Sequence, residues 1–196
     1  MSSDVLPQFG TSASVRRLNW GCGSWVEPGW INSDMKDLPG IDIACDIREG
    51  LPLPDGSIDY IVSIHSLPEL PYDDLVPALK ELRRVLKPSG VLRLGLPDLE
   101  KAIDAYRRGD KSYFLVPDEH ARTIGGKLAV QMVWYGYSRS LFTMDFVQEL
   151  LASAGYSNVR PSRFRQTNSR FPEIVDLDNR PDESLFVEAE RLGGAT

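Results

Sequence analysis

The feature that most constrains the fold is an apolar run, followed by a helix-type pattern and then by a second apolar run. The first run, 58–64, has the length of a strand that is buried on both faces. Between 72 and 86, apolar residues recur at steps of three and four, which is typical of an amphipathic helix. A further strand-length run follows at 91–96. Strands that alternate with helices predict an α/β fold with a mainly parallel sheet.

Shorter segments extend this alternation in both directions. Further strands are expected at 18–20, 30–34, 41–46, 157–164 and 184–189. Asp98 and Thr143 are predicted to be N-caps of two more helices, the second of which ends at Gly155. Residues 109–140 have no clear periodicity, and no secondary structure is predicted for them.

Length and composition indicate an ordinary globular protein. The chain has 196 residues, of which 42% are hydrophobic and 26% charged, and we expect a leader at 1–15 before one domain at 16–196. The net charge of −6 argues against nucleic acid held on a broad basic face. Two cysteines without a C-x-x-C pair argue against a zinc site, and no metal is expected. Because the sequence lacks a signal peptide and a membrane-length apolar stretch, we expect a cytoplasmic location.

Residues suited to ligand binding directly follow several of the predicted strands. They are Gly21-Cys22-Gly23, Asp34, Asp46, His65 and Pro97-Asp98. In open α/β sheets, ligands bind outside the carboxyl ends of the strands. The sequence therefore predicts a ligand site at this edge of the sheet.

The glycine loop is not suited to a dinucleotide. A nicotinamide fingerprint needs a third glycine where this chain has Val26, and an acid about 20 residues beyond the first glycine. Asp34 follows Gly21 by only 13 residues, and the chain has no G-x-x-x-x-G-K-[ST] phosphate loop. A nicotinamide-dependent oxidoreductase is thus disfavoured. A ligand with ribose and adenine but no phosphate fits the two acids better.

The same residues resemble the opening of class I S-adenosylmethionine-dependent methyltransferases, and most closely the small type 11 branch. The resemblance lies in Leu18-Asn19-Trp20-Gly21-Cys22-Gly23 and then in Gly29-Trp30-Ile31-Asn32-Ser33-Asp34. Segments 53–61, 86–94, 150–156 and 184–189 resemble later parts of the family in order. The resemblance implies a Rossmann-like three-layer sandwich. Its seven-stranded sheet would be mostly parallel, with an antiparallel last strand and a shortened first helix.

The resemblance also implies S-adenosylmethionine as the cofactor. Asp34 would accept hydrogen bonds from the ribose hydroxyls, and Asp46 from the adenine amine. Met35 would pack on the adenine ring. The remaining cofactor-binding residues that it implies are Asn19, Gly21, Cys22, Gly23, Ile47, Ser63 and His65.

Candidates for catalysis and acceptor binding are fewer. His65 and His120 could act as a general base near neutral pH. Where family members often have His-x-Leu-Glu-His, this chain has His65-Ser66-Leu67-Pro68-Glu69, which puts an inherited catalytic role there in doubt. Trp134, Tyr135 and Tyr137 could line an acceptor pocket, because 109–140 would cover that pocket in this fold.

The predicted function is methyl transfer from S-adenosylmethionine to a small-molecule or glycan acceptor. The alternative is a non-catalytic module on the same fold that binds S-adenosylmethionine or another protein. A second copy of the chain is a candidate partner. Arg160, Arg163, Arg165 and Arg170 form a basic run, for which a solvated face is the first interpretation and an anionic partner the second.

Overall fold

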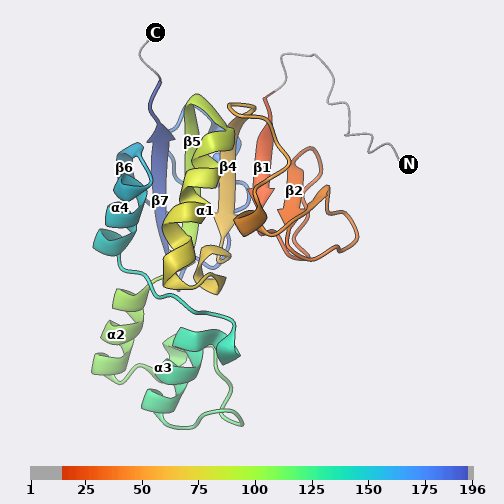
Figure 1. The fold of residues 1–196 in the computed structure, drawn as a ribbon. Helices are drawn as coiled ribbons and strands as arrows, with labels where there is room; N and C mark the ends of the chain where they lie inside the picture. The colour runs from red at the N-terminus through yellow and green to blue at the C-terminus, as the bar shows by residue number, and fades with distance from the viewer. Residues whose placement is uncertain (1–14, 194–196) are drawn as a thin grey trace.

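Seven strands form one sheet in the computed structural model, which describes residues 15–193 (Figure 1). Their order is β3-β2-β1-β4-β5-β7-β6, and β7 runs antiparallel to both of its neighbours. This confirms the predicted mostly parallel sheet with an antiparallel last strand. The strands are β1 (Arg17–Trp20), β2 (Ile31–Asp34), β3 (Ile43–Ala44), β4 (Ile58–Ile64), β5 (Leu86–Pro97), β6 (Tyr156–Ser162) and β7 (Ser184–Arg191). Residues 1–14 of the predicted leader lie outside the described residues.

The predicted helices form close to their expected bounds. Asp98 caps its helix by accepting from the backbone N–H groups of Glu100 and Lys101. Thr143 occupies the N-cap position, but its hydroxyl bonds to Asp145 instead of capping the helix. The α-helices are α1 (Tyr72–Val85), α2 (Leu99–Arg108), α3 (Ile124–Val133) and α4 (Met144–Ser153). The 3-10 turns are η1 (Ile47–Glu49), η2 (Leu67–Glu69), η3 (Lys111–Tyr113), η4 (Trp134–Gly136) and η5 (Pro172–Val175).

Strand β5 begins earlier than the sequence predicts. Leu86 already pairs with Ile58, whereas Val91 pairs with Tyr60, so the residues between Leu86 and Val91 form a bulge inside the strand. The end of α1 at Val85 agrees with the predicted helix to within one residue, whereas the strand expected at 91–96 already starts at Leu86. The helix ends at Val85 because the next residue is already extended and paired in the sheet.

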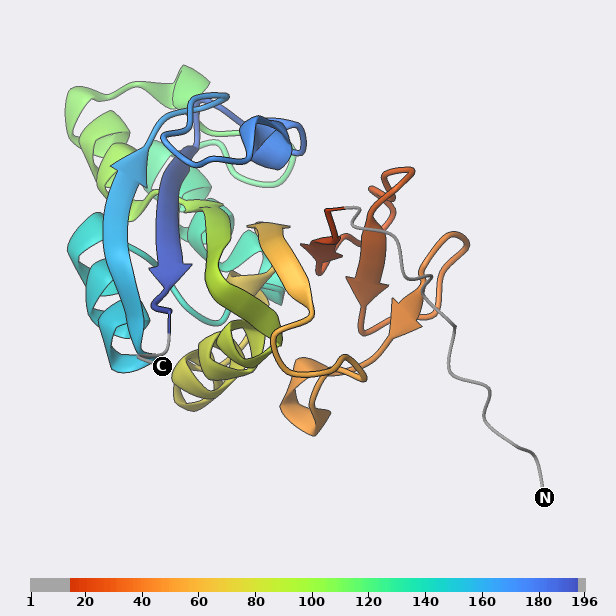
Figure 2. The same ribbon diagram turned by 90° about the horizontal axis from the view of Figure 1, so that it is seen from above.

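Between β1 and β2, residues 21–30 form only turns in the described structure. This agrees with a shortened first helix and affects how the sheet is covered. Helices α1 and α4 pack on one face, over a core that includes Leu18, Leu79 and Leu151 (Figure 1). The other face is covered by the connection between β6 and β7, residues 163–183, which contains η5 (Figure 2).

Aromatic packing attaches this β6–β7 segment to the sheet. Phe171 and Ile174 are buried against Trp30 and Tyr60. The ring centroids of Tyr60 and Phe171 lie 4.9 Å apart, and those of Tyr60 and Trp30 lie 5.3 Å apart. Each of these rings removes a large apolar area from water, which stabilises the segment without a regular helix.

A buried arginine provides a second attachment. Arg93 on β5 is fully buried, and its Nε donates to Asp178 Oδ1 at 2.7 Å. Its Nη1 donates to Glu188 Oε1 at 2.6 Å, and its Nη2 to the backbone carbonyl of Arg163 at 2.9 Å. Burying a charge is costly unless it is paired and hydrogen-bonded, as it is here. The network holds both ends of the β6–β7 segment on the sheet.

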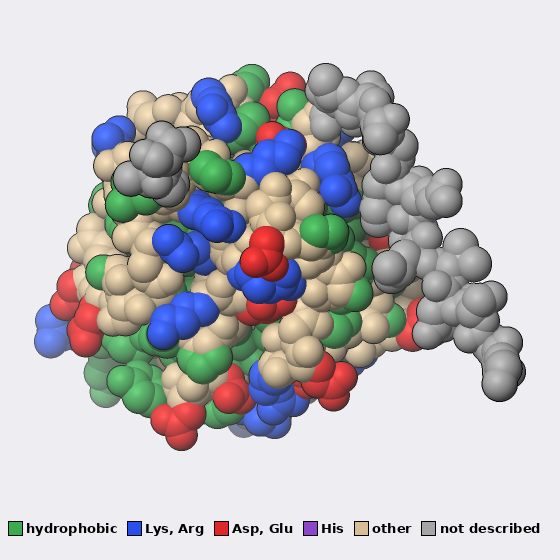
Figure 3. All heavy atoms as spheres, turned by 45° about the horizontal axis from the view of Figure 1, so that its top comes forward, with side chains coloured by type: hydrophobic (Ala, Val, Ile, Leu, Met, Phe, Trp, Pro, Cys, Tyr) green, Lys and Arg blue, Asp and Glu red, His purple; other side chains and the backbone are tan. Residues whose placement is uncertain are grey.

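The predicted basic run lies on the surface. Arg160, Arg163, Arg165 and Arg170 are all exposed, which agrees with the solvated-face interpretation. On the face shown in Figure 3, Lys and Arg side chains form separate groups between neutral and acidic ones. None of the helices in the described residues is long and apolar enough to cross a membrane.

Candidate active site

Three cavities open at the carboxyl ends of the parallel strands. The cofactor cleft, of about 400 Å³, lies between the glycine loop and the ends of β2 and β3. The aromatic cavity, of about 100 Å³, contains Tyr113, Trp134 and Tyr137. The side cavity, of about 350 Å³, separates the glycine loop from the β6–β7 segment. Arg180 lines all three.

The two glycines of the loop serve different purposes. Both have a positive φ, +66° at Gly21 and +54° at Gly23, which L-residues with a side chain rarely adopt. A Cβ on Gly21 would lie 2.2 Å from Ser66 Oγ, so Gly21 allows the loops after β1 and β4 to meet. Ser66 Oγ donates to the Gly21 carbonyl at 2.5 Å. A Cβ on Gly23 would meet nothing within 4 Å, because this residue faces open space.

Asp34 ends β2 at the centre of the cofactor cleft. Its Oδ2 accepts from the Gly23 backbone N–H at 2.8 Å, and its Oδ1 from that of Lys36 at 2.9 Å. Each carboxylate oxygen has two lone pairs, so each can accept a further hydrogen bond from a ligand. Asp34 therefore orders the loop and keeps acceptor capacity for hydroxyl groups.

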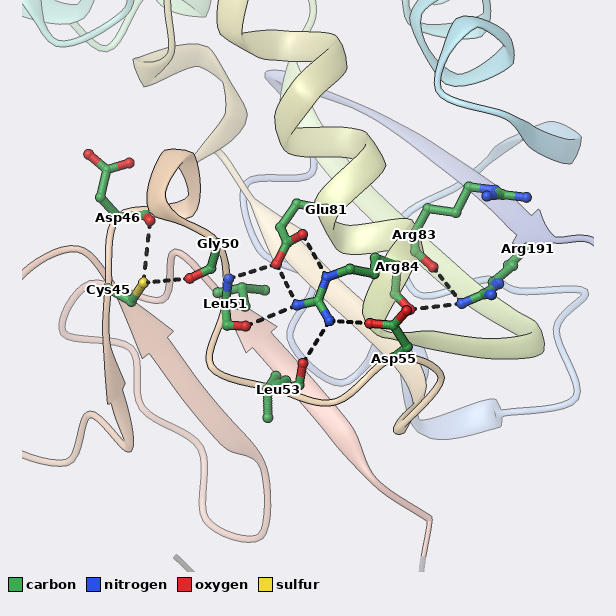
Figure 4. A network of polar contacts seen from close by, with 10 residues as sticks. All are labelled: Cys45, Asp46, Gly50, Leu51, Leu53, Asp55, Glu81, Arg83, Arg84 and Arg191. Carbon is green, nitrogen blue, oxygen red and sulfur yellow. Dashed lines mark hydrogen bonds and ion pairs between the residues drawn. The ribbon is translucent and has the colours of Figure 1, made fainter. Parts of the chain in front are cut away.

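Asp46 also lines the cleft, but a neighbour already holds its carboxylate. Arg48 Nε lies 3.0 Å from both oxygens, and Arg48 Nη2 lies 2.5 Å from Oδ2. The hydrogen bonds from Arg48 hold the pKa of Asp46 below its usual range. The segment that follows is fixed by Arg84 of α1, which donates to the carbonyls of Leu51 and Leu53 (Figure 4).

Two other predicted residues of the loop are structural in this geometry. Asn19 donates to the Trp25 carbonyl at 2.9 Å and to Asn32 Oδ1 at 3.1 Å, and it lines the side cavity. Cys22 is buried, and burial raises the pKa of its thiol to about 11, with the charge of Asp34 adding to the effect. Cys22 is therefore protonated near neutral pH and fills the loop.

His65 lies at the junction of the cofactor cleft and the aromatic cavity, with both ring nitrogens engaged. Nε2 lies 2.7 Å from Ser184 Oγ, and Nδ1 lies 3.4 Å from Arg180 Nη1. A guanidinium only donates, so Nδ1 accepts and Nε2–H donates to Ser184. Burial, followed by the charge of Arg180, lowers the pKa of His65 to about 3. The imidazole is thus neutral. Its φ of 58° is also strained, as is the φ of 55° at Arg180.

The aromatic cavity depends on an unusual turn. Trp134 and Tyr135 both have positive φ, 40° and 57°, and their rings meet edge to face with centroids 5.6 Å apart. Trp134 lines the cavity together with Tyr137. Tyr135 is instead about half exposed, and its hydroxyl lies 2.9 Å from His120 Nδ1. His120 is exposed as well, and neither residue is among those that line the three cavities.

Carboxylates that sequence reasoning did not assign also face the aromatic cavity. Glu69 lines both it and the cofactor cleft, and Glu183 lines the aromatic cavity with only 9% of its surface exposed. Burial raises the pKa of both carboxyl groups. Arg180 Nη1 lies 3.4 Å from Glu183 Oε1.

The structure thus brings most of the predicted cofactor residues together. Around the cofactor cleft lie Gly21, Cys22, Gly23, Asp34, Met35, Asp46, Ile47 and His65. Ser63 is buried in β4 and is not among the residues that line the cavities. Sequence reasoning missed Arg48, Tyr113, Arg180 and Glu183. No motif marks them: Arg48 lies in a short turn after β3, and the other three lie in residues 109–140 and the β6–β7 segment, which carry no periodic pattern.

Comparison with known proteins agrees with this geometry. Residues 27–94 match the type 11 family model, described as a methyltransferase domain. The demethylmenaquinone methyltransferase of Staphylococcus carnosus (strain TM300) is 30% identical over 134 residues, which are 66% of this chain and 53% of that protein. The chain thus spans about half the length of this curated relative.

Solved structures share the fold. A methyltransferase of Thermotoga maritima, described as a possible histamine N-methyltransferase, aligns with a TM-score of 0.57 and 18% identity over 92% of this chain and 84% of that one. A methyltransferase of Archaeoglobus fulgidus aligns with a TM-score of 0.57 and 13% identity, over 91% and 86%. The fold is therefore that of S-adenosylmethionine-dependent methyltransferases. The match to the type 11 family model covers residues 27–94 of the 196 in this chain.

The residues of the cofactor cleft fit S-adenosylmethionine. Gly23 faces open space, and Asp34 can accept two more hydrogen bonds. The exposed thioether of Met35 and the side chain of Ile47 offer apolar contact for a flat ring. The acids Asp34 and Asp46 would repel a pyrophosphate. The volume of about 400 Å³ lies within the range of about 300–1,000 Å³ that is usual for small-molecule sites.

Proposed function

We propose that this chain catalyses methyl transfer from S-adenosylmethionine to a small-molecule acceptor, in the cytoplasm. When bound, the cofactor supplies an electrophilic methyl group on its sulfonium. The observation that carries the proposal is the junction of two cavities: His65, Glu69 and Arg180 line both the cofactor cleft and the aromatic cavity. Ligands in the two cavities would meet at these three residues.

The cofactor-binding roles follow from the lining of the cleft. Asp34 would accept from the ribose hydroxyls, while Met35 and Ile47 would flank the adenine ring. Asp46 remains our candidate for the adenine amine, sharing its oxygens with Arg48. Gly21 and Gly23 would keep the backbone close to the methionine part of the cofactor. Asn19 would hold this loop in place through its hydrogen bond to the Trp25 carbonyl.

Catalysis would depend chiefly on position. Holding two reactants in line can lower a barrier by about 7–11 kcal/mol. Neither histidine of the chain offers a free nitrogen at the junction, because His65 bonds to Ser184 and Arg180, and His120 lies with Tyr135. We therefore assign His65 to the orientation of Arg180. The assignment of His120 as a base stays a prediction.

The dimensions of the aromatic cavity favour a small acceptor or the small end of a larger one. A cavity needs about 10–15 Å³ to hold one water, so about 100 Å³ admits a small group. Only one end of a glycan would fit into this cavity. The name of the Staphylococcus carnosus relative also describes methylation of a small molecule, demethylmenaquinone.

A non-catalytic module on the same fold is the second candidate. One observation favours it: the carboxylate of Asp46 is bound by Arg48, so one of the two proposed acids is less available to a ligand. Such a module would bind the cofactor weakly or not at all.

Thermal unfolding with S-adenosylmethionine, S-adenosylhomocysteine and a nicotinamide dinucleotide tests the proposal. A ligand at 100 times its Kd stabilises by about 2.7 kcal/mol, a shift of about 5–10 °C for a chain of this size. We expect this shift with the two sulfur compounds only. Asp34→Asn should abolish it, whereas Asp37→Asn, which removes an exposed charge nearby, should retain it. No shift in the wild type would contradict the proposal and favour the non-catalytic module.

A further inference from the structure

Acidic side chains dominate the charged lining of the aromatic cavity. Glu69, Asp98 and Glu183 line it, whereas Arg180 is the one basic side chain among the lining residues. His65 is neutral because burial and Arg180 lower its pKa to about 3. The net charge of the side chains that line the cavity is therefore negative.

The three acids differ in the hydrogen bonds and ion pairs that they already make. Asp98 Oδ1 accepts the backbone N–H groups of Glu100 and Lys101 as the cap of α2. For Glu183, the contact is Arg180 Nη1 at 3.4 Å from Oε1, which is long for a hydrogen bond. Glu183 is thus a nearly buried carboxylate whose charge is only partly compensated.

Tyr113 lies close to the same negative charges. Its pKa is raised above the ordinary value by burial first, and then by the charges of Asp98, Glu183 and Asp182. Negative charge near a phenol disfavours a second negative charge, and it would favour a positive one in the same place.

Gln131 offers a hydrogen-bond donor to the aromatic cavity. It is 7% exposed, and its Oε1 accepts the Leu115 backbone N–H at 2.7 Å. This bond fixes the orientation of the amide, so its NH₂ group is the free end. The NH₂ group has no hydrogen-bond partner among the described residues, although Gln131 lines the cavity. This donor is open to an acceptor atom elsewhere on a ligand that carries an ammonium group, because the ammonium group itself only donates.

The walls add an aromatic contribution. Tyr113, Trp134 and Tyr137 line the cavity beside these acids. A cation over the face of an aromatic ring is attracted by the negative charge of that face, and Trp is the best such ring. Aromatic faces next to carboxylates are suited to an organic cation, and an anion would meet three acids instead.

We propose that the acceptor is an amine, bound in the aromatic cavity as its ammonium form, and that Glu183 takes the proton that the nitrogen loses. This rests on the proposed methyl transfer. The nitrogen gives one proton to the Glu183 carboxylate, and the freed lone pair forms the new N–CH₃ bond. The C–S bond of the sulfonium breaks with its electron pair left on sulfur. Glu183 then releases the proton to water.

The test is ligand binding to the complex with S-adenosylhomocysteine, measured by calorimetry. Three matched probes differ in charge: 2-phenylethylamine, 2-phenylethanol and phenylacetate. We expect the amine to bind at least tenfold more tightly than the other two. Glu183→Gln should remove most of this preference. Glu173→Gln, which deletes an exposed charge of the β6–β7 segment outside the lining of the cavity, should leave it in place.

Controls separate this inference from the proposed function. Affinity for S-adenosylhomocysteine and the Tm of each variant report on the fold and the cofactor cleft. If Glu183→Gln fails to fold, Glu69→Gln at an exposed position replaces it and should weaken amine binding severalfold. Intact S-adenosylhomocysteine binding without an amine preference overturns the amine proposal alone. Absent S-adenosylhomocysteine binding contradicts the proposed function, and the probes are then tested on the free protein.

Discussion

The imidazole of His65 and the hydroxyl of Ser184 join the end of β4 to the beginning of β7 through a 2.7 Å hydrogen bond. The same ring meets Arg180 of the β6–β7 segment on its other side. A residue that the sequence suggested as a general base is therefore part of the wall between two cavities, and its neutral form is the one that the fold requires.

This arrangement predicts a dependence of stability on pH. The pKa of His65 is about 3 in the folded protein and about 6.5 in the unfolded chain. Between these values the unfolded chain binds a proton that the folded protein does not, so stability falls as pH falls below 6.5. The slope from this group approaches about 1.4 kcal/mol per pH unit.

Urea unfolding at pH 7.0, 6.0 and 5.0 measures this slope. Other groups contribute, because the raised pKa of Glu69 and Glu183 acts in the opposite direction. The difference between wild type and His65→Asn isolates the histidine. We expect the variant to lose less stability on acidification, and His120→Asn, at the exposed histidine, to behave like the wild type. Equal slopes for wild type and His65→Asn would show that the ring is not held neutral.

Alanine substitutions at the two loop glycines should have different consequences. Each forces a side chain into left-handed backbone, at about 1–2 kcal/mol. Gly21→Ala also brings a Cβ to 2.2 Å from Ser66 Oγ, so it should destabilise the protein more than Gly23→Ala. Adding Ser66→Gly to Gly21→Ala should recover part of the loss, since it removes the overlapping atoms. Chemical denaturation of the four proteins checks this order.

Gly23→Ala should instead affect ligand binding. Its methyl group would occupy open space in the cofactor cleft, so affinity for S-adenosylhomocysteine should fall more than stability does. If Gly23→Ala bound S-adenosylhomocysteine as tightly as the wild type, the methionine part of the ligand could not lie against this residue.

The buried network on β5 should be essential for the β6–β7 segment. Asp178→Ala leaves the Arg93 charge with Glu188 as its remaining carboxylate partner. Removing one partner of a buried ion pair costs about 3–5 kcal/mol. We expect that loss in urea unfolding, together with weaker cofactor binding, because Arg180 lies two residues beyond Asp178. Asp176→Ala, at an exposed acid of the same segment, is the control and should change stability little.

Much of the fold could be predicted from sequence because its strands are short, apolar and regularly spaced. Ile58–Ile64 was predicted with its observed bounds, and Asp98 was correctly predicted as a cap. The bulge after Leu86 could not be predicted, since it depends on pairing with Ile58 across the sheet. Helix α3 was missed because two glycines follow its first residue, and glycine weakens any helical signal.

The site was only partly predictable for a related reason. Gly21, Gly23, Asp34 and Asp46 follow strands directly, so topology alone brings them together. Arg180 and Glu183 reach the site only because Arg93, a charge in an apolar strand, holds the β6–β7 segment in place. That pairing joins residues 85 positions apart, and no local pattern reveals it.

The position of sulfur in a crystal structure with S-adenosylhomocysteine tests the central claim most directly. We predict that the ribose hydroxyls bond to Asp34 and that the sulfur faces the junction formed by His65, Glu69 and Arg180, so that a methyl group would point into the aromatic cavity. A ligand bound outside the cofactor cleft would contradict the account. So would a sulfur directed away from the aromatic cavity, because the two cavities would then serve separate purposes.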